Sequence, residues 1–308
     1  MFFAKFFEPK PFNQGYLPEV DGHKVFFMEF GNPKGEVVLT THGGPGECVR
    51  HKYEKRFDLK KYRVIVFDQR GVGDSRPFGE VKNNTPWKTV EDMKRLLDYL
   101  KVRGKILVCG GSWASTVALL FAIDSPERVS KLLLSQIFVP GPNYRKWEFD
   151  VMYNMYPDII DELRSRVKVK ADVPEYYAKL INSDNAEDQY DAIKYYGAYE
   201  YMMGALDPKF RDVEVDDAKL AKLRVYMTYD ANNYYLEDDS IWGNLDRIKH
   251  IPTIIVHNRL DLNCPFLYAW KLHKGIPKSK LVIVPEAGHG GPLMSKVRKE
   301  EFARFLDE

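Results

Sequence analysis

Short runs of almost wholly apolar residues recur along this chain, and they limit the folds open to it more than any other feature. Examples are Val64-Ile65-Val66-Phe67, Leu132-Leu133-Leu134 and Ile254-Ile255-Val256. A strand that is apolar on successive residues is buried on both faces, as in a parallel sheet covered by helices on each side. We predict strands at residues 25–30, 36–41, 63–68, 105–109, 131–137, 253–257 and 280–284.

Helical patterns lie between several of these strands. Residues 89–101 place Val90, Met93, Leu97 and Leu100 along one stripe, and residues 112–123 and 293–306 are also predicted to be helices. Strands that alternate with helices in this way indicate an α/β fold with a mostly parallel, doubly wound sheet.

The alternation stops in the middle of the chain. Residues 141–242 contain few strand-like runs, hold 14 of the 19 tyrosines, and from Pro142 to Trp242 carry 21 acidic against 13 basic residues. So sharp a change in composition predicts that residues 141–242 are an inserted helical cap subdomain. Residues 1–140 and 243–308 would then form the core.

The overall charge excludes some function classes. Lys and Arg number 46, Asp and Glu number 44, and the net charge is +2, which gives no argument for a nucleic-acid or membrane partner.

The three cysteines, Cys48, Cys109 and Cys264, are widely spaced and form neither a disulfide framework nor a CxxC metal pair. A cytoplasmic location is therefore expected. We also expect no signal peptide and no membrane span.

Gly110-Gly111-Ser112-Trp113-Ala114 marks a candidate nucleophile, because it joins a predicted strand to a predicted helix. The G-x-S-x-G elbow uses such a tight turn to expose the serine Oγ above the sheet, although Ala114 stands here in place of the second glycine. The start of the helix also offers N–H groups to a developing oxyanion. Taken alone, the motif is equally compatible with a turn that caps a helix.

Two further motifs fit the same chemistry. His42-Gly43-Gly44-Pro45-Gly46 follows a predicted strand, as does the loop that supplies a second oxyanion donor in esterases with this elbow. A serine nucleophile also needs a base and a carboxylate that orients it, in the chain order Ser, Asp, His. Asp261 and His289 each follow a late strand in that order. His257 is also near, so His289 is selected by its position.

The combined motifs resemble the proline iminopeptidase family of α/β-hydrolases. The resemblance rests on Asp68-Gln69-Arg70-Gly71-Val72-Gly73-Asp74-Ser75, on the His42 and Ser112 motifs, and on Asp261 with Cys264-Pro265. It implies Ser112 as nucleophile, His289 as base and Asp261 as its orienting group. It also implies oxyanion donors at the backbone N–H groups of Gly44 and Trp113. The expected activity is release of an N-terminal residue, preferentially proline, from peptides with a free N-terminus.

The same resemblance implies substrate-binding residues. The free amine of the substrate needs a carboxylate, since charge-assisted hydrogen bonds are strong. Glu200 in Tyr195-Tyr196-Gly197-Ala198-Tyr199-Glu200 is the first candidate and Asp230 the second. Phe138 and Cys264 are expected beside the pyrrolidine ring. Ser135 stands where relatives commonly have an arginine.

Two alternatives remain open from the sequence. The first is an esterase or amidase for small molecules that uses the same triad and does not need Glu200. The second is a non-catalytic ligand-binding relative, although such a protein would usually lack part of the triad. No metal or organic cofactor is expected, because the histidines and carboxylates are not spaced as in H-E-x-x-H. The oligomeric state is not predicted.

Overall fold

The computed structural model describes residues 9–49, 53–167, 172–203 and 209–308, and only the backbone of Glu200 and Tyr201. Within these ranges eight strands form one sheet in the order β1-β2-β4-β3-β5-β6-β7-β8. β1 pairs antiparallel with β2, and β2 with β4, whereas every later pair is parallel. The strands are β1 (Asn13–Tyr16), β2 (Phe26–Gly31), β3 (Glu36–Thr41), β4 (Tyr62–Phe67), β5 (Ile106–Ser112), β6 (Val129–Ile137), β7 (Thr253–Asn258) and β8 (Ser279–Val284).

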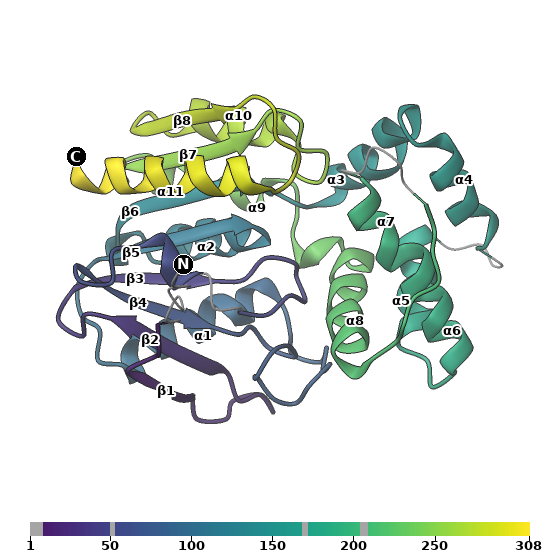
Figure 1. The fold of residues 1–308 in the computed structure, drawn as a ribbon, viewed down its shortest axis with the longest axis horizontal. Helices are drawn as coiled ribbons and strands as arrows, with labels where there is room; N and C mark the ends of the chain where they lie inside the picture. The colour runs from purple at the N-terminus through teal and green to yellow at the C-terminus, as the bar shows by residue number, and fades with distance from the viewer. Residues whose placement is uncertain (1–8, 50–52, 168–171, 204–208) are drawn as a thin grey trace, which may run out of the picture.

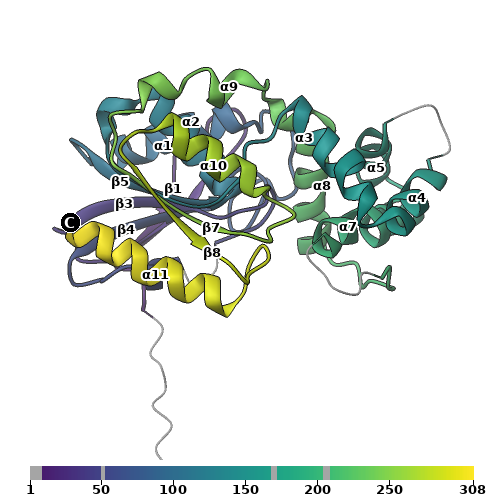
Figure 2. The same cartoon turned by 90° about the horizontal axis from the view of Figure 1, so that it is seen from above.

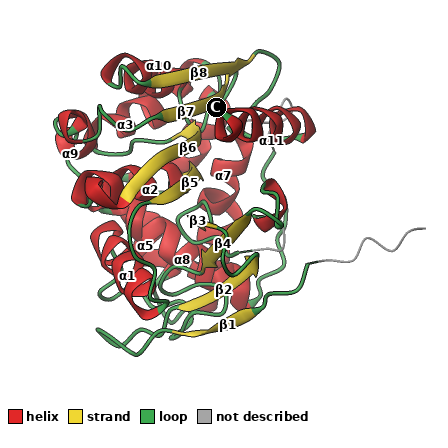
Figure 3. Ribbon diagram, turned by 90° about the vertical axis from the view of Figure 1, so that its left-hand side faces the viewer, coloured by secondary structure: helices red, strands yellow, loops and turns green. Residues whose placement is uncertain are grey.

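Helices cover both faces of this sheet. In Figure 3, α1, α2 and α10 lie on one side and α11 on the other. The helices are α1 (Pro86–Tyr99), α2 (Trp113–Asp124), α3 (Pro142–Lys146), α4 (Pro157–Ser165), α5 (Val173–Ile181), α6 (Ala186–Asp191), α7 (Gly197–Met202), α8 (Asp217–Ala231), α9 (Asp239–Trp242), α10 (Phe266–Gly275) and α11 (Pro292–Asp307). Among the described residues, no helix is long and apolar enough to cross a bilayer.

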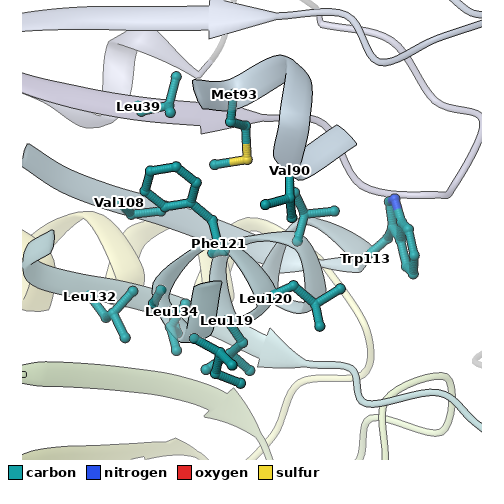
Figure 4. Packing of buried hydrophobic residues seen from close by; sticks show 14 of the residues in the cluster. Leu39, Val90, Met93, Val108, Trp113, Leu119, Leu120, Phe121, Leu132 and Leu134 are labelled. Carbon is teal, nitrogen blue, oxygen red and sulfur yellow. The ribbon is translucent and has the colours of Figure 1, made fainter. Parts of the chain in front are cut away.

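Successive residues of the central strands enter different hydrophobic clusters. Leu132 and Leu134 of β6 pack with Val90, Phe121 and their neighbours on α1 and α2 (Figure 4). Leu133 between them packs toward α11, with Phe302. Burial on both faces explains why the strand is apolar at each position, and the predicted fold class is confirmed.

Two elements were missed by sequence reasoning. β1 is a polar, mostly exposed edge strand, so it carries no apolar pattern. α10 buries only Ala269 and Leu272, and its apolar stripe is correspondingly narrow. Elsewhere the boundaries shift by a few residues: α1 begins at Pro86 rather than 89, because Thr85 caps it by accepting a hydrogen bond from Lys88 N at 3.3 Å.

Between β6 and β7 the described elements are helical. Figures 1 and 2 show α4 to α8 grouped beside one end of the sheet. These helices share a hydrophobic cluster of their own, which includes Ile160, Tyr177, Tyr196 and Met227. The segment that follows α8 returns to the main core, where Ile241 of α9 packs.

A buried ion pair ties the loop after β4 to α1. Arg70 Nε and Nη2 donate to the two carboxylate oxygens of Asp92 at 2.6 and 2.9 Å, and both residues are buried. Arg70 Nη1 also donates to the Asn83 carbonyl at 2.7 Å. Bidentate geometry of this kind holds the loop firmly. The Asp68–Ser75 motif therefore has a structural use at Arg70.

We expect Arg70→Met to lower the free energy of unfolding by about 3 kcal/mol, because it leaves the Asp92 carboxylate buried with only Arg95 beside it. The matched control is Arg103→Met, which removes an exposed ion pair with Asp98 and should cost less than about 0.5 kcal/mol. Urea unfolding followed by circular dichroism measures both. Equal midpoints for the two variants would contradict the assignment.

Candidate active site

Ser112 lies at the turn from β5 to α2 in a backbone conformation that is unusual for a residue with a side chain. Its φ is 57° and its ψ is −136°. The packing around it is tight, since a Cβ on Gly110 would lie 2.1 Å from the Ala114 carbonyl oxygen and a Cβ on Gly111 would lie 2.6 Å from Ser135 Oγ. A side chain at 110 would clash with backbone, so glycine is required there, whereas one at 111 would have to displace the Ser135 hydroxyl. The methyl group of Ala114 is accommodated in the core.

The first turn of α2 also fixes the strand beside it. Ser115 Oγ donates to the Ser112 carbonyl at 2.7 Å and accepts from the Phe138 N–H at 3.0 Å. Thr116 Oγ1 donates to the Phe138 carbonyl at 2.6 Å. Three hydrogen bonds from two hydroxyl groups thus hold Phe138 at a set distance from Ser112.

Asp261 and His289 meet at the carboxyl ends of β7 and β8. His289 Nδ1 lies 3.0 Å from both carboxylate oxygens of Asp261, which is buried. The Cys264 N–H also donates to Asp261 Oδ1 at 2.9 Å. Because the carboxylate accepts the Nδ1 proton, Nε2 of the neutral ring has a lone pair for taking up another proton.

A small cavity of about 20 Å³ brings most of the predicted site residues together. That volume holds about one water molecule. The three tyrosines that line the cavity, Tyr144, Tyr226 and Tyr234, were not singled out from the sequence, which showed only that residues 141–242 are rich in tyrosine. The lining residues are Gly44, Ser112, Phe138, Tyr144, Tyr226, Tyr234, Asn263, Cys264 and His289.

Tyr234 enters this cavity from an unusual turn. Asn233, Tyr234 and Tyr235 have φ values of 50°, 57° and 54°, so three successive residues without glycine are left-handed. The Tyr234 ring packs against Trp113 and Phe138, with ring centroids 5.8 and 5.3 Å apart. Left-handed residues normally occur singly, so these contacts must compensate for an unfavourable backbone.

The loop that carries Gly44 is fixed by hydrogen bonds to Gln69. The Gln69 N–H donates to His42 Nε2 and its side-chain amide donates to the His42 carbonyl, each at 3.0 Å. Trp113 Nε1 donates to Gln69 Oε1 at 2.8 Å. Burial lowers the pKa of His42, which favours the neutral ring that can accept. Gln69 thus joins the Gly44 loop to the first residue of α2.

Asp230, near the end of α8, lies beside a guanidinium group and does not line the small cavity. Its Oδ2 accepts from the Tyr196 hydroxyl, and its Oδ1 is 3.5 Å from Arg145 Nη1. Arg145 is also 3.9 Å from Glu148 and 3.6 Å from Asp172. Burial raises the pKa of Asp230, while Arg145 opposes that shift. Three carboxylates thus surround one cation. Glu200 belongs to α7, and its side chain lies outside the described residues.

One group of side chains has the composition of a metal site. Asp261, Cys264 and His289 each offer a ligand atom, and these atoms lie within 4.8 Å of one another. The same Asp261 oxygens already accept hydrogen bonds from His289 and from the Cys264 backbone. The arrangement therefore also fits a hydrogen-bonded carboxylate–imidazole pair.

His257 has a structural position next to this pair. Its Nδ1 accepts from the Ile137 N–H at 2.9 Å, so Nε2 carries the proton and donates to the Cys264 carbonyl at 2.9 Å. Burial lowers the pKa of His257. The ring joins the ends of β6 and β7 to the loop after Asp261.

Gln136 joins the His289 loop to α11. Its φ is 48°, its Nε2 donates to the His289 carbonyl, and its Oε1 accepts from Arg298 Nη1 at 3.1 Å. With this left-handed backbone, the Gln136 side-chain amide lies between the His289 carbonyl and the Arg298 guanidinium group.

A larger cavity of about 740 Å³ lies on the other side of the Gly44 loop. Its lining includes Gly46, Cys48, Val72, Met202 and Leu223, and none of the predicted site residues whose side chains the structure describes. Gly46 packs closely against α8, where a Cβ would meet the Lys222 carbonyl oxygen at 2.3 Å. That contact lies between the large cavity and Tyr226 in the small one.

Known proteins of two kinds are similar to this chain. A family model described as the alpha/beta hydrolase fold matches residues 36–293. The proline iminopeptidase of Arabidopsis thaliana is 37% identical over 292 residues, which cover 91% of this chain and 76% of that protein. The probable proline iminopeptidase of Leptolyngbya boryana is 36% identical, over 91% and 89%. The solved structure of a putative lipase from Acinetobacter baumannii has a TM-score of 0.59 at 18% identity, covering 96% of this chain and 90% of that one.

The neutral state of His257 predicts a pH dependence of stability. An unfolded histidine has a pKa of about 6.5. Below that pH the unfolded chain binds a proton that folded His257 excludes, so the free energy of unfolding falls toward acid pH. His257→Gln cannot bind the proton and should reduce this slope between pH 7 and 5. Urea titrations at several pH values measure it, and identical slopes would contradict the assignment.

Gln136→Gly should slow the reaction of Ser112 with a serine-directed phosphonylating reagent by about tenfold, because the loop that carries His289 loses its link to α11. Stability should change little, since glycine relieves the left-handed strain at this position. Stopped-time labelling with mass spectrometry gives the rate, and Ser112→Ala is the unlabelled control. A wild-type labelling rate in Gln136→Gly would show that the link does not position His289.

Proposed function

Because this chain belongs to the proline iminopeptidase family of α/β-hydrolases, we propose that it is a serine aminopeptidase that releases an N-terminal residue, preferentially proline, from peptides. The observation that carries the proposal is the His289–Asp261 pair, which lies beside Ser112 and Gly44 at one small cavity. A nucleophile, a base and an oxyanion donor are the groups that acyl transfer needs.

In the proposed mechanism Ser112 Oγ attacks the carbonyl carbon of the N-terminal residue while His289 Nε2 takes the hydroxyl proton. Asp261 stabilises the resulting imidazolium. The N–H groups of Gly44 and Trp113 donate to the oxyanion. The tetrahedral intermediate then collapses, the C–N bond breaks, and His289 returns the proton to the leaving amine. Water hydrolyses the acyl-enzyme with His289 again as base, which frees the amino acid and regenerates Ser112.

The cap, residues 141–242, is proposed to recognise the free amine of the peptide. Glu200 and Asp230 are the candidate partners. The described part of the cap supports a cation site, because Glu148, Asp172 and Asp230 together outnumber the single charge of Arg145. Charge-assisted hydrogen bonds make such a site selective for an ammonium group.

Phe138 and Cys264, which line the small cavity, are proposed to contact the pyrrolidine ring. The large cavity, lined by Gly46 two residues after Gly44, is proposed to take the rest of the peptide. A cytoplasmic location is also proposed, since no disulfide joins Cys48, Cys109 or Cys264, all within the described ranges.

Three substrates test the reaction: a prolyl-arylamide, its N-acetyl derivative and a short-chain aryl ester. We expect rapid cleavage of the prolyl-arylamide, at least about 100-fold slower cleavage of the acetylated compound, and no cleavage by Ser112→Ala. Cleavage of the ester alone would leave an esterase with the same nucleophile and would overturn the peptidase assignment.

Glu200→Gln should lower kcat/KM for the prolyl-arylamide by about 10–100-fold, because a charged hydrogen bond worth about 1.5–3 kcal/mol is lost. It should barely affect the short-chain ester, which has no ammonium group. Glu187→Gln, which changes an exposed acid of α6, is the matched control. An equal loss on amide and ester would remove Glu200 from amine recognition.

A further inference from the structure

A third space, distinct from both the small and the large cavity, lies directly behind one wall of the small cavity. Its volume is about 300 Å³, and it lies between α3 and α10, which adjoin each other in Figure 2. We call it the α3–α10 pocket. Its lining residues are Val139, Pro140, Asn143, Tyr144, Lys146, Trp147, Val151, Asp238, Trp242, Pro265, Leu267, Tyr268 and Lys271.

Tyr144 separates the two spaces. Among the described residues it alone lines both of them. At two other places the boundary falls between neighbouring residues. Phe138 lines the small cavity and Val139 lines the pocket, and Cys264 lines the small cavity and Pro265 lines the pocket. The buried ring of Tyr144 is therefore a partition one side chain thick.

Several contacts hold this partition in place. The Tyr144 ring meets Phe138 edge to face, with centroids 4.9 Å apart, and its hydroxyl donates to the Asn263 carbonyl at 3.1 Å. Burial raises the pKa of Tyr144, so the hydroxyl stays a neutral donor. The other two tyrosines of the cavity pack against further aromatic rings: Tyr234 contacts Trp113, and Tyr226 contacts Tyr196.

The direction of the partition matters for the substrate. In the proposed tetrahedral intermediate on Ser112, the oxyanion is at the N–H groups of Gly44 and Trp113, and the leaving amine is on the side of His289. Phe138 and Cys264, the residues proposed to contact the pyrrolidine ring, line the small cavity together with Tyr144, whose ring packs on Phe138. In the proposed binding mode a proline side chain would end beside Phe138 and Cys264, whereas a longer side chain would meet Tyr144.

We propose that Tyr144 is the specificity-determining residue that limits the N-terminal residue to about the size of proline, and that the α3–α10 pocket behind it would accept an aromatic side chain if Tyr144 were replaced by a smaller residue. The pocket suits that ligand, because Trp147, Trp242 and Tyr268 supply aromatic faces and 300 Å³ exceeds the volume of a phenyl ring. The proposal rests on the serine aminopeptidase function proposed above.

The test compares prolyl- and phenylalanyl-4-nitroanilide. In Tyr144→Ala the ratio of kcat/KM for phenylalanyl over prolyl substrate should rise at least about tenfold, because pocket contacts of one or a few methylene groups carry that much discrimination. Tyr144→Phe keeps the ring and should change the ratio by less than about threefold. Tyr177→Ala removes a buried cap tyrosine that lines neither space and should leave the ratio as it is.

A second substitution tests whether any gain on the phenylalanyl substrate comes from access to the α3–α10 pocket or from a general loosening of the cap. Leu267 is half-exposed at the edge of the α3–α10 pocket, so Leu267→Trp should fill the pocket without burying new charge. In the Tyr144→Ala background it should return the ratio to within about threefold of wild type. A gain that persists in the double variant, or an equal loss on both substrates in Tyr144→Ala, would overturn the proposal. If Tyr144→Ala does not fold, Tyr144→Val serves in its place.

A ladder of aryl esters from acetyl to octanoyl keeps this result distinct from the proposed function. Ester cleavage needs Ser112 but no free amine, and Tyr144→Ala should move the preferred acyl chain to greater length. A shift on esters in an enzyme that cleaves no free-amine substrate would refute the aminopeptidase function and support the partition. Cleavage of the prolyl substrate with no shift in preference among either the anilides or the esters would support the aminopeptidase function and refute the partition.

Discussion

The close contact between the end of β5 and the start of α2 is the constraint on which the rest of this site depends. Gly110 lies so near the Ala114 carbonyl that no side chain fits, and Ser112, between them at the end of β5, has a positive φ of 57°. The same helical turn holds Phe138 through Ser115 and Thr116. The candidate nucleophile and the wall opposite it are therefore positioned by one packing interaction.

Parallel strands bring the remaining groups to the same edge. Asp261 follows β7 and His289 follows β8, so their side chains meet although 28 positions separate them in the sequence. Each loop is then anchored from outside the site: His257 holds the Asp261 loop and Gln136 holds the His289 loop. Rigid strands with fixed loops are what an acyl-transfer site requires, because small displacements of the base are costly in rate.

The sheet and the main site motifs could be predicted from the sequence because they depend on local patterns. Continuous apolar runs follow from burial on both faces, and the order Ser112, Asp261, His289 follows from the strand ends. The cavity tyrosines could not be predicted, since 14 tyrosines lie in residues 141–242 and only tertiary packing selects Tyr144, Tyr226 and Tyr234. The position of Asp230 beside Arg145 likewise depends on how α3 meets α8, which no local pattern specifies.

The left-handed turn at Asn233–Tyr235 links the energetics of the cap to the shape of the cavity. A backbone of this kind is populated only while the Tyr234 ring keeps its contacts with Trp113 and Phe138. Any motion that separates the end of α8 from those rings removes the compensation, so the turn is drawn toward ordinary right-handed geometry. A displacement of the end of α8 and the withdrawal of Tyr234 from the cavity wall are therefore expected to occur together.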